Sequence, residues 1–202
     1  MSHLTRRFAA LLFVALPAMA VTPIGQQLAV RLDGDYLRVS APHLNFLTGK
    51  PLERLKEGGS IAFLGQVSIS TGPNTIEARS VARFALSYDI WEEKFSITRI
   101  GADSRRTVSH LSVAATEAWC LDNLAIDRKQ LPTDKPFFVS LDLRVEDPRD
   151  QNGVIGDPGI NITRMIELFS RPARSQQPRW LIPGGPYNLA DLKKMEVRGV
   201  RG

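Results

Sequence analysis

The strongest constraint on the fold is the regular alternation of apolar and polar residues between Phe137 and Val145. The odd-numbered residues are all apolar, whereas three of the four even-numbered residues, Ser140, Asp142 and Arg144, are polar. This period of two places every second side chain on one face of a β-strand. A strand with one apolar and one polar face is typical of an antiparallel sheet with one solvent-facing side.

Similar alternation recurs in shorter runs. These runs cover residues 28–32, 37–39, 61–69, 84–90 and 95–97. Asp33-Gly34 separates the first two, and Asp-Gly between such runs predicts a β-hairpin. Most of the connections are too short for the crossovers that parallel strands need. We therefore predict a mainly β (α+β) fold with an antiparallel, sandwich-like sheet, and a small β-barrel is the alternative.

A few short helices are also predicted, at residues 51–57, 113–122, 162–169 and 188–195. The first begins with Pro51 and stops at Gly58, a pairing typical of helix ends. The second and third follow Ser112 and Asn161, whose side chains commonly cap helix N-termini. The stretches 147–159 and 170–186 are rich in Gly, Pro and polar residues, and we predict long loops for both.

The N-terminus has the organisation of a secretory signal peptide. Arg6-Arg7 precedes the apolar run 8–19, and Ala18-Met19-Ala20 matches the small-x-small motif of a cleavage site. An uncleaved anchor is the alternative, but Pro17 interrupts a run shorter than the about 20 residues that span a bilayer. We predict cleavage after Ala20, a periplasmic or secreted location, and no transmembrane segment in the mature chain.

We accordingly divide the chain into a signal peptide (1–20), a β-rich domain (21–147) and a C-terminal extension (148–202). The extension is predicted as a loop plus helices packed on the same domain, ending in a basic tail. Loss of Arg6-Arg7 would lower the net charge from +5 to +3. Without a basic stripe interleaved with aromatic residues, we expect no nucleic-acid partner. We expect a monomer.

Motifs for catalysis are weak. The predicted mature chain offers His43 and His110 as imidazole bases and Cys120 as its one thiol. A cysteine in an apolar helix is typically a small core residue, and a single cysteine cannot form an internal disulfide. We assign no catalytic residue and no cofactor; a hydrolase with an unassigned pair of carboxylates is the enzymatic alternative.

An oxygen-rich loop is a weak calcium candidate. Its potential ligands are Asp147, Asp150, Asn152 and Asp157. Pro148 and Gly159 stand where an EF-hand loop requires ligands. The alternative is ordinary turn chemistry, which favours the same residue types.

One C-terminal segment has the composition of a binding surface. The candidate partner-binding residues are Arg171, Arg174, Arg179, Trp180 and Tyr187. Arg, Trp and Tyr are the residue types enriched at interface hot spots. The alternative is that Trp180, Leu181 and Ile182 fold back and cover an edge of the sheet, because such a triplet is rarely left exposed.

The stretch from Arg83 to Thr98, with Leu-Ser-Tyr before the turn and an aromatic-led return strand, resembles the central hairpin of an exported bacterial domain family of unknown function. The helix, Gly-Gly and strand of 52–69 and the helix of 109–124 occur in the same order, so the resemblance covers about residues 30–147. The region after Asp147 departs from that family. The resemblance implies a β-rich periplasmic domain without established activity, and it assigns no site residues.

From these features we expect an exported, non-enzymatic domain that acts by contact with an envelope protein whose identity the sequence does not give. A binding module for a small apolar or lipid-like ligand, held between sheet and helices, is the main alternative.

Overall fold

The computed structural model describes residues 28–102, 104–147, 160–172 and 177–199. Its strands are β1 (Ala29–Asp33), β2 (Tyr36–Ser40), β3 (Ile61–Gly72), β4 (Thr75–Asp89), β5 (Lys94–Ile100), β6 (Arg105–Leu111), β7 (Ile126–Asp127), β8 (Phe137–Val145) and β9 (Arg179–Tyr187). Its helices are α1 (Lys50–Lys56), α2 (Val113–Asp122), α3 (Ile162–Ser170) and α4 (Leu189–Gly199), with a 3₁₀ turn at Arg128–Gln130.

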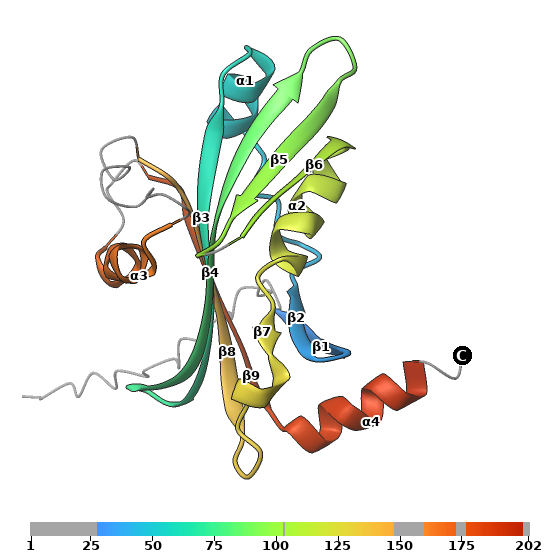
Figure 1. Cartoon of the computed structure of the whole chain (residues 1–202), viewed down its shortest axis with the longest axis vertical. Coiled ribbons are helices and arrows are strands. Elements are labelled where there is room, and N and C mark those ends of the chain that lie inside the picture. The colour runs from blue at the N-terminus through green and yellow to red at the C-terminus, as the bar shows by residue number, and fades with distance from the viewer. Residues whose placement is uncertain (1–27, 103, 148–159, 173–176, 200–202) are drawn as a thin grey trace, which may run out of the picture.

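The strands form two antiparallel sheets. The larger has the order β6-β5-β4-β3-β8-β9, and the smaller has the order β1-β2-β7. The long strands β3 and β4 run along most of the molecule (Figure 1). The predicted antiparallel, sandwich-like α+β fold is confirmed. The barrel alternative is wrong for the described residues, because their larger sheet ends at β6 and β9 without closing.

The larger sheet buries apolar side chains on both of its faces. On one face, Phe63, Phe84 and Leu141 belong to the main core, which includes residues of the smaller sheet and α2. On the other face, Leu64 of β3 packs in a smaller apolar cluster with residues of α3 such as Met165. Figure 1 shows α2 and α3 on opposite sides of the sheet. Removal of apolar surface from water, worth roughly 25 cal/mol per Å², is the main stabilising contribution of both layers.

The predicted helix caps and the predicted hairpin turn are present in the structure. The Ser112 Oγ accepts a hydrogen bond from the Ala115 N–H at 3.2 Å, and α2 runs from Val113 to Asp122 as expected. The Asn161 side chain caps α3 in the same way. Gly34 adopts a φ of 58° in the turn between β1 and β2, a conformation that suits glycine.

The predicted loop at 170–186 is wrong in its second half, because β9 begins at Arg179 and pairs with β8. Pro183 and Pro186 suggested a loop, but an edge strand tolerates proline because one side of its backbone needs no partner. Strands β6 and β7 were not predicted. Most of the other predicted loop, 147–159, lies outside the described residues.

None of the helices in the described part of the chain combines the length and apolar character needed to cross a bilayer.

Candidate functional site

Helix α2 is unusual because the face that it turns away from the core is apolar. Cys120 and Leu121 are buried, whereas Ala114 and Ala118, four residues apart, are exposed. Residues at this spacing lie on one face of a helix. A surface helix normally carries charged or polar residues on its outer face. The exposed alanine face of α2 is therefore suited to contact with a ligand or another protein.

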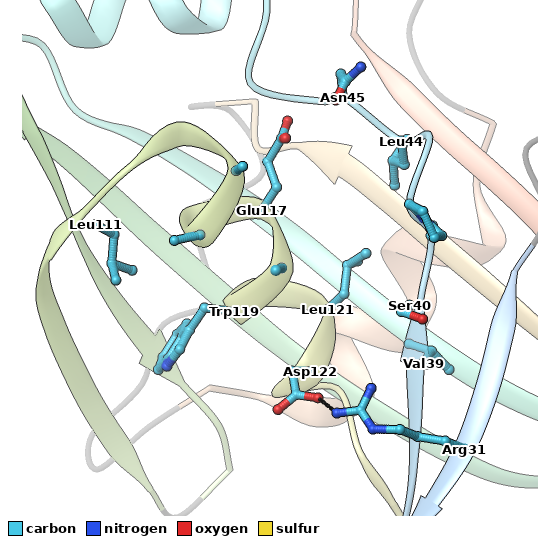
Figure 2. A pocket seen from close by; sticks show the side chains of 15 residues that line it. Arg31, Val39, Ser40, Leu44, Asn45, Leu111, Glu117, Trp119, Leu121 and Asp122 are labelled. Atoms are coloured by element: carbon cyan, nitrogen blue, oxygen red, sulfur yellow. Dashed lines mark hydrogen bonds and ion pairs between the residues drawn. The ribbon is translucent and has the colours of Figure 1, made fainter. Parts of the chain in front are cut away.

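A groove of about 580 Å³ runs beside this alanine face. It lies between α2, strand β2 and the segment 41–45 that follows β2, and Figure 2 shows side chains from all three around it. Its apolar lining includes Val39, Leu44, Leu111, Ala115, Ala118 and Leu121. The volume falls within the range of about 300–1,000 Å³ that is common for small-molecule sites.

Ion pairs lie at one end of the groove. The Arg31 guanidinium contacts the Asp122 carboxylate at 2.5 Å, and the contact is drawn in Figure 2. Arg38 donates to the Asp122 carbonyl oxygen at 2.8 Å and contacts its carboxylate at 3.2 Å. These partly exposed pairs add little stability. They do tie β1 and β2 to the C-terminal end of α2, where cations are favourable.

Glu117 connects α2 to the segment that follows β2, on the other side of the groove. One of its carboxylate oxygens accepts a hydrogen bond from the Leu47 N–H at 2.7 Å, although the two residues lie 70 positions apart. Burial raises the pKa of Glu117, and hydrogen bonds from the backbone of Leu47 and Phe46 partly oppose this rise. The carboxylate therefore holds the segment after β2 against α2 and sets the shape of the groove.

The three nucleophile and base candidates lie on different parts of the fold. Cys120 is fully buried on the core side of α2, and its burial, followed by the charge of Glu117, raises the pKa of its thiol. His110 is exposed and lies 3.0 Å from Glu92. His43 is exposed on the segment after β2. In the part of the chain that the structure describes, no contact joins them into a catalytic group.

Two buried carboxylates that a hydrolase could use are already held by arginines. Asp142 makes two hydrogen bonds with Arg179, and Glu146 makes two with Arg83. Carboxylates held in this bidentate way are fixed as ion-pair partners. Within the described residues, no group of three or more His, Cys, Asp or Glu side chains could hold a metal ion.

Of the calcium candidates, Asp147 follows the end of β8, and Asp150, Asn152 and Asp157 lie outside the described residues.

The candidate partner-binding residues are separated by the structure. Arg179 pairs with Asp142, and the Tyr187 hydroxyl donates to the Leu28 carbonyl oxygen at 2.7 Å. Arg171 is exposed after α3, and Arg174 lies outside the described residues. Arg179 and Tyr187 therefore already have partners in the same chain.

Trp180 faces the main core. Its ring centroid lies 6.1 Å from that of Phe46 and 6.3 Å from that of Phe63. Ile182 is buried, whereas Leu181 is 61% exposed on the other face of β9. The three residues therefore do not cover an edge of the sheet but extend it as the edge strand β9, with Trp180 and Ile182 turned toward the core and Leu181 turned away.

Comparison of the chain with protein-family models, curated proteins and solved structures finds no match to any of them. The site must therefore be interpreted from its own geometry.

The groove was missed by the sequence analysis because its walls come from segments about 70 residues apart. One signal was present in the sequence. Helix α2 contains only two charged residues, Glu117 and Asp122, so the outward face of the helix had to be apolar.

Proposed function

We propose that the protein is an exported, non-enzymatic binding protein of the bacterial envelope that acts by protein–protein contact through the groove beside α2. The observation that carries this proposal is the exposed alanine face of α2, which forms one apolar wall of the groove. The Arg31–Asp122 ion pair lies at its margin. An apolar centre with a polar rim is the usual anatomy of a protein interface.

The shape of the groove favours a polypeptide as the occupant. The groove is open to solvent along α2 rather than enclosed. Small-molecule sites generally bury most of the ligand surface. An apolar side chain of a partner protein needs burial only on the side that enters the groove, and the partner itself covers the rest.

Export is the second part of the proposal, and it is supported by the leader pattern of residues 1–20. Mass spectrometry of the protein from its native host should find Val21 as the N-terminal residue in the periplasmic or secreted fraction. A cytosolic protein that retains Met1 would contradict export and would leave the groove proposal to its own test.

The groove is tested by placing a photo-crosslinking amino acid at Ala118, with Ala190 as the matched control. Both are exposed alanines in helices, but Ala190 belongs to α4 and does not line the groove. We expect a defined envelope protein to be crosslinked from position 118 and not from position 190. An excess of unlabelled protein should compete for the partner and reduce this crosslinking. The variant Ala118→Arg should fail to compete, whereas Ala190→Arg should compete as the unaltered protein does. Equal crosslinking from both positions would contradict the proposal.

The volume of the groove favours a second candidate, a small apolar or lipid-like ligand. Trp119 lines the groove, so its fluorescence would report such a ligand. The substitution Trp91→Phe removes the background fluorescence of Trp91, which is 95% exposed. This variant is then titrated with a long-chain fatty acid. A saturable spectral shift that Ala118→Arg abolishes would favour this candidate, and a flat titration would remove it.

A further inference from the structure

The two edge strands of the larger sheet, β6 and β9, differ in their ability to pair with another strand. Strand β9 contains Pro183 and Pro186, which have no backbone N–H to donate. Strand β6 contains no proline, and most of its residues are exposed. Among the described residues, β6 pairs only with β5. The edge of β6 therefore presents backbone donors and acceptors that a further strand could use.

The hairpin between β5 and β6 determines which backbone groups face outward. The Gly101 N–H donates to the Ser104 carbonyl oxygen at 2.8 Å, which makes this pair a hydrogen-bonded one. Hydrogen-bonded and non-hydrogen-bonded pairs alternate along an antiparallel ladder. Arg106 therefore bonds to β5, whereas Arg105 and Thr107 direct their N–H and C=O groups away from it.

The same strand carries two adjacent arginines, Arg105 and Arg106, at its beginning. Arg106 lies directly opposite Arg99 of β5. Arg99 donates to the Asn123 carbonyl oxygen at 3.0 Å and to the Ser104 hydroxyl at 3.1 Å. No carboxylate in the described part of the chain pairs with either arginine, and like charges directly opposite each other are unfavourable. Burial, followed by the charge of Arg106, lowers the pKa of Arg99.

We infer that β6 accepts an extended, acidic segment of the partner protein as a seventh strand, with an acidic side chain opposite Arg106. This inference rests on the proposed function, in which the protein acts by protein–protein contact. Strand addition obtains affinity from main-chain hydrogen bonds and specificity from side chains on the two faces. A second copy of β6 is a poor occupant, because it would bring further arginines against Arg105 and Arg106.

The strand and the groove adjoin each other. Leu111 is the last residue of β6 and also lines the groove, and α2 begins two residues later. One partner could therefore pair with β6 and place an apolar side chain in the groove.

The inference is tested with a short fluorescent peptide of alternating glutamate and valine, and binding to the purified protein is followed by fluorescence anisotropy. A peptide with lysine in place of glutamate is the control. We expect saturable binding of the acidic peptide only, weakened by added salt. Arg106→Glu should weaken binding by about tenfold, because attraction is replaced by repulsion.

A matched pair of variants at Thr107 separates strand addition from simple charge attraction. Thr107→Pro and Thr107→Val both remove the hydroxyl contact with Thr98, but only proline also removes the outward N–H. We expect Thr107→Pro to weaken binding by about fivefold, the loss of roughly one hydrogen bond, while Thr107→Val binds as the unaltered protein does. Circular dichroism of both variants verifies that the fold is kept.

Equal binding of the acidic and basic peptides, or a Thr107→Pro variant that binds as well as Thr107→Val, would overturn the inference. Both results are independent of the crosslinking at Ala118. Loss of crosslinking with intact peptide binding would contradict the groove, whereas the reverse would contradict the seventh strand.

Discussion

Arg83 and Glu146, 63 residues apart in the chain, form a buried bidentate ion pair. The Arg83 Nε lies 2.8 Å from one carboxylate oxygen of Glu146, and an Arg83 terminal nitrogen lies 2.7 Å from the other. Arg83 belongs to β4, whereas the Glu146 N–H donates to Ala62 of β3 immediately after β8 ends. The pair therefore spans β3 and links its two neighbouring strands.

Removal of one member of this pair should destabilise the protein severely. Glu146→Ala leaves a buried guanidinium without its carboxylate, and we expect the free energy of unfolding to fall by about 3 kcal/mol or more. The double variant Arg83→Met with Glu146→Leu should lose much less, because neither charge of the pair is then left buried without the other. Urea denaturation of the single and double variants measures both values. A double variant that loses as much stability as Glu146→Ala would contradict this explanation.

Gly65 should not tolerate a methyl group. A Cβ at this position would lie 2.8 Å from a methyl carbon of Leu124 and 3.1 Å from the ring of Phe84. Both side chains are buried, so overpacking should make Gly65→Ala less stable by about 1–3 kcal/mol in thermal or urea denaturation. Gly72→Ala is the control, because the nearest atom would lie at 3.7 Å. Its stability should change by less than about 0.5 kcal/mol. Equal losses would show that the contact with Leu124 is not the cause.

The raised pKa of Glu117 should make the protein lose stability as pH increases. Because burial raises this pKa in the folded state, the folded protein binds the proton more tightly than the unfolded chain. The resulting stability is present below the ordinary carboxyl pKa and is lost as pH rises through the higher folded value. Glu117→Gln should therefore gain stability relative to the unaltered protein as pH rises above the ordinary carboxyl pKa of 4.5, as measured by urea denaturation over a range of pH values that starts below it. A constant difference across that range would contradict the prediction.

Cys120 should be chemically inert while the protein is folded. Its side chain is fully buried, and its pKa is raised, so both access and the fraction of reactive thiolate are low. A thiol-reactive maleimide at neutral pH should label the protein only in denaturant. The variant Ala118→Cys provides the control on the same helix, and it should react with one equivalent of reagent in the folded state. Rapid labelling of Cys120 in the native protein would show that α2 opens readily.

The elements that the sequence predicted correctly are those whose pattern lies within a short stretch of the chain. Helix α2 was predicted with its correct ends because Ser112, which caps it, is adjacent in sequence. Strand β8 was predicted because apolar and polar residues alternate along it, although its polar residues Asp142 and Arg144 are buried as well. Strand β6 was missed because its place at the edge leaves most of its side chains exposed, so no alternation developed.

Features that depend on distant segments could not be predicted. The hydrogen bond between Glu117 and Leu47 shapes the groove, but neither residue has a local pattern that implies the other. Arg179 was predicted as a partner-binding residue because of its chemical type, and its pairing with Asp142 became evident only when β9 was placed beside β8. The sequence thus predicted individual helices and strands better than the contacts between residues that are distant in the chain.

The central strands β3 and β4 contribute alternate side chains to the clusters on both faces of the sheet, with Phe63 and Phe84 on one side and Leu64 and Val81 on the other. Neither layer can come apart without loosening the strands that support the other. The two layers should therefore melt together in one cooperative transition, and the amide hydrogens of β3 and β4 should be the last to exchange with deuterated solvent.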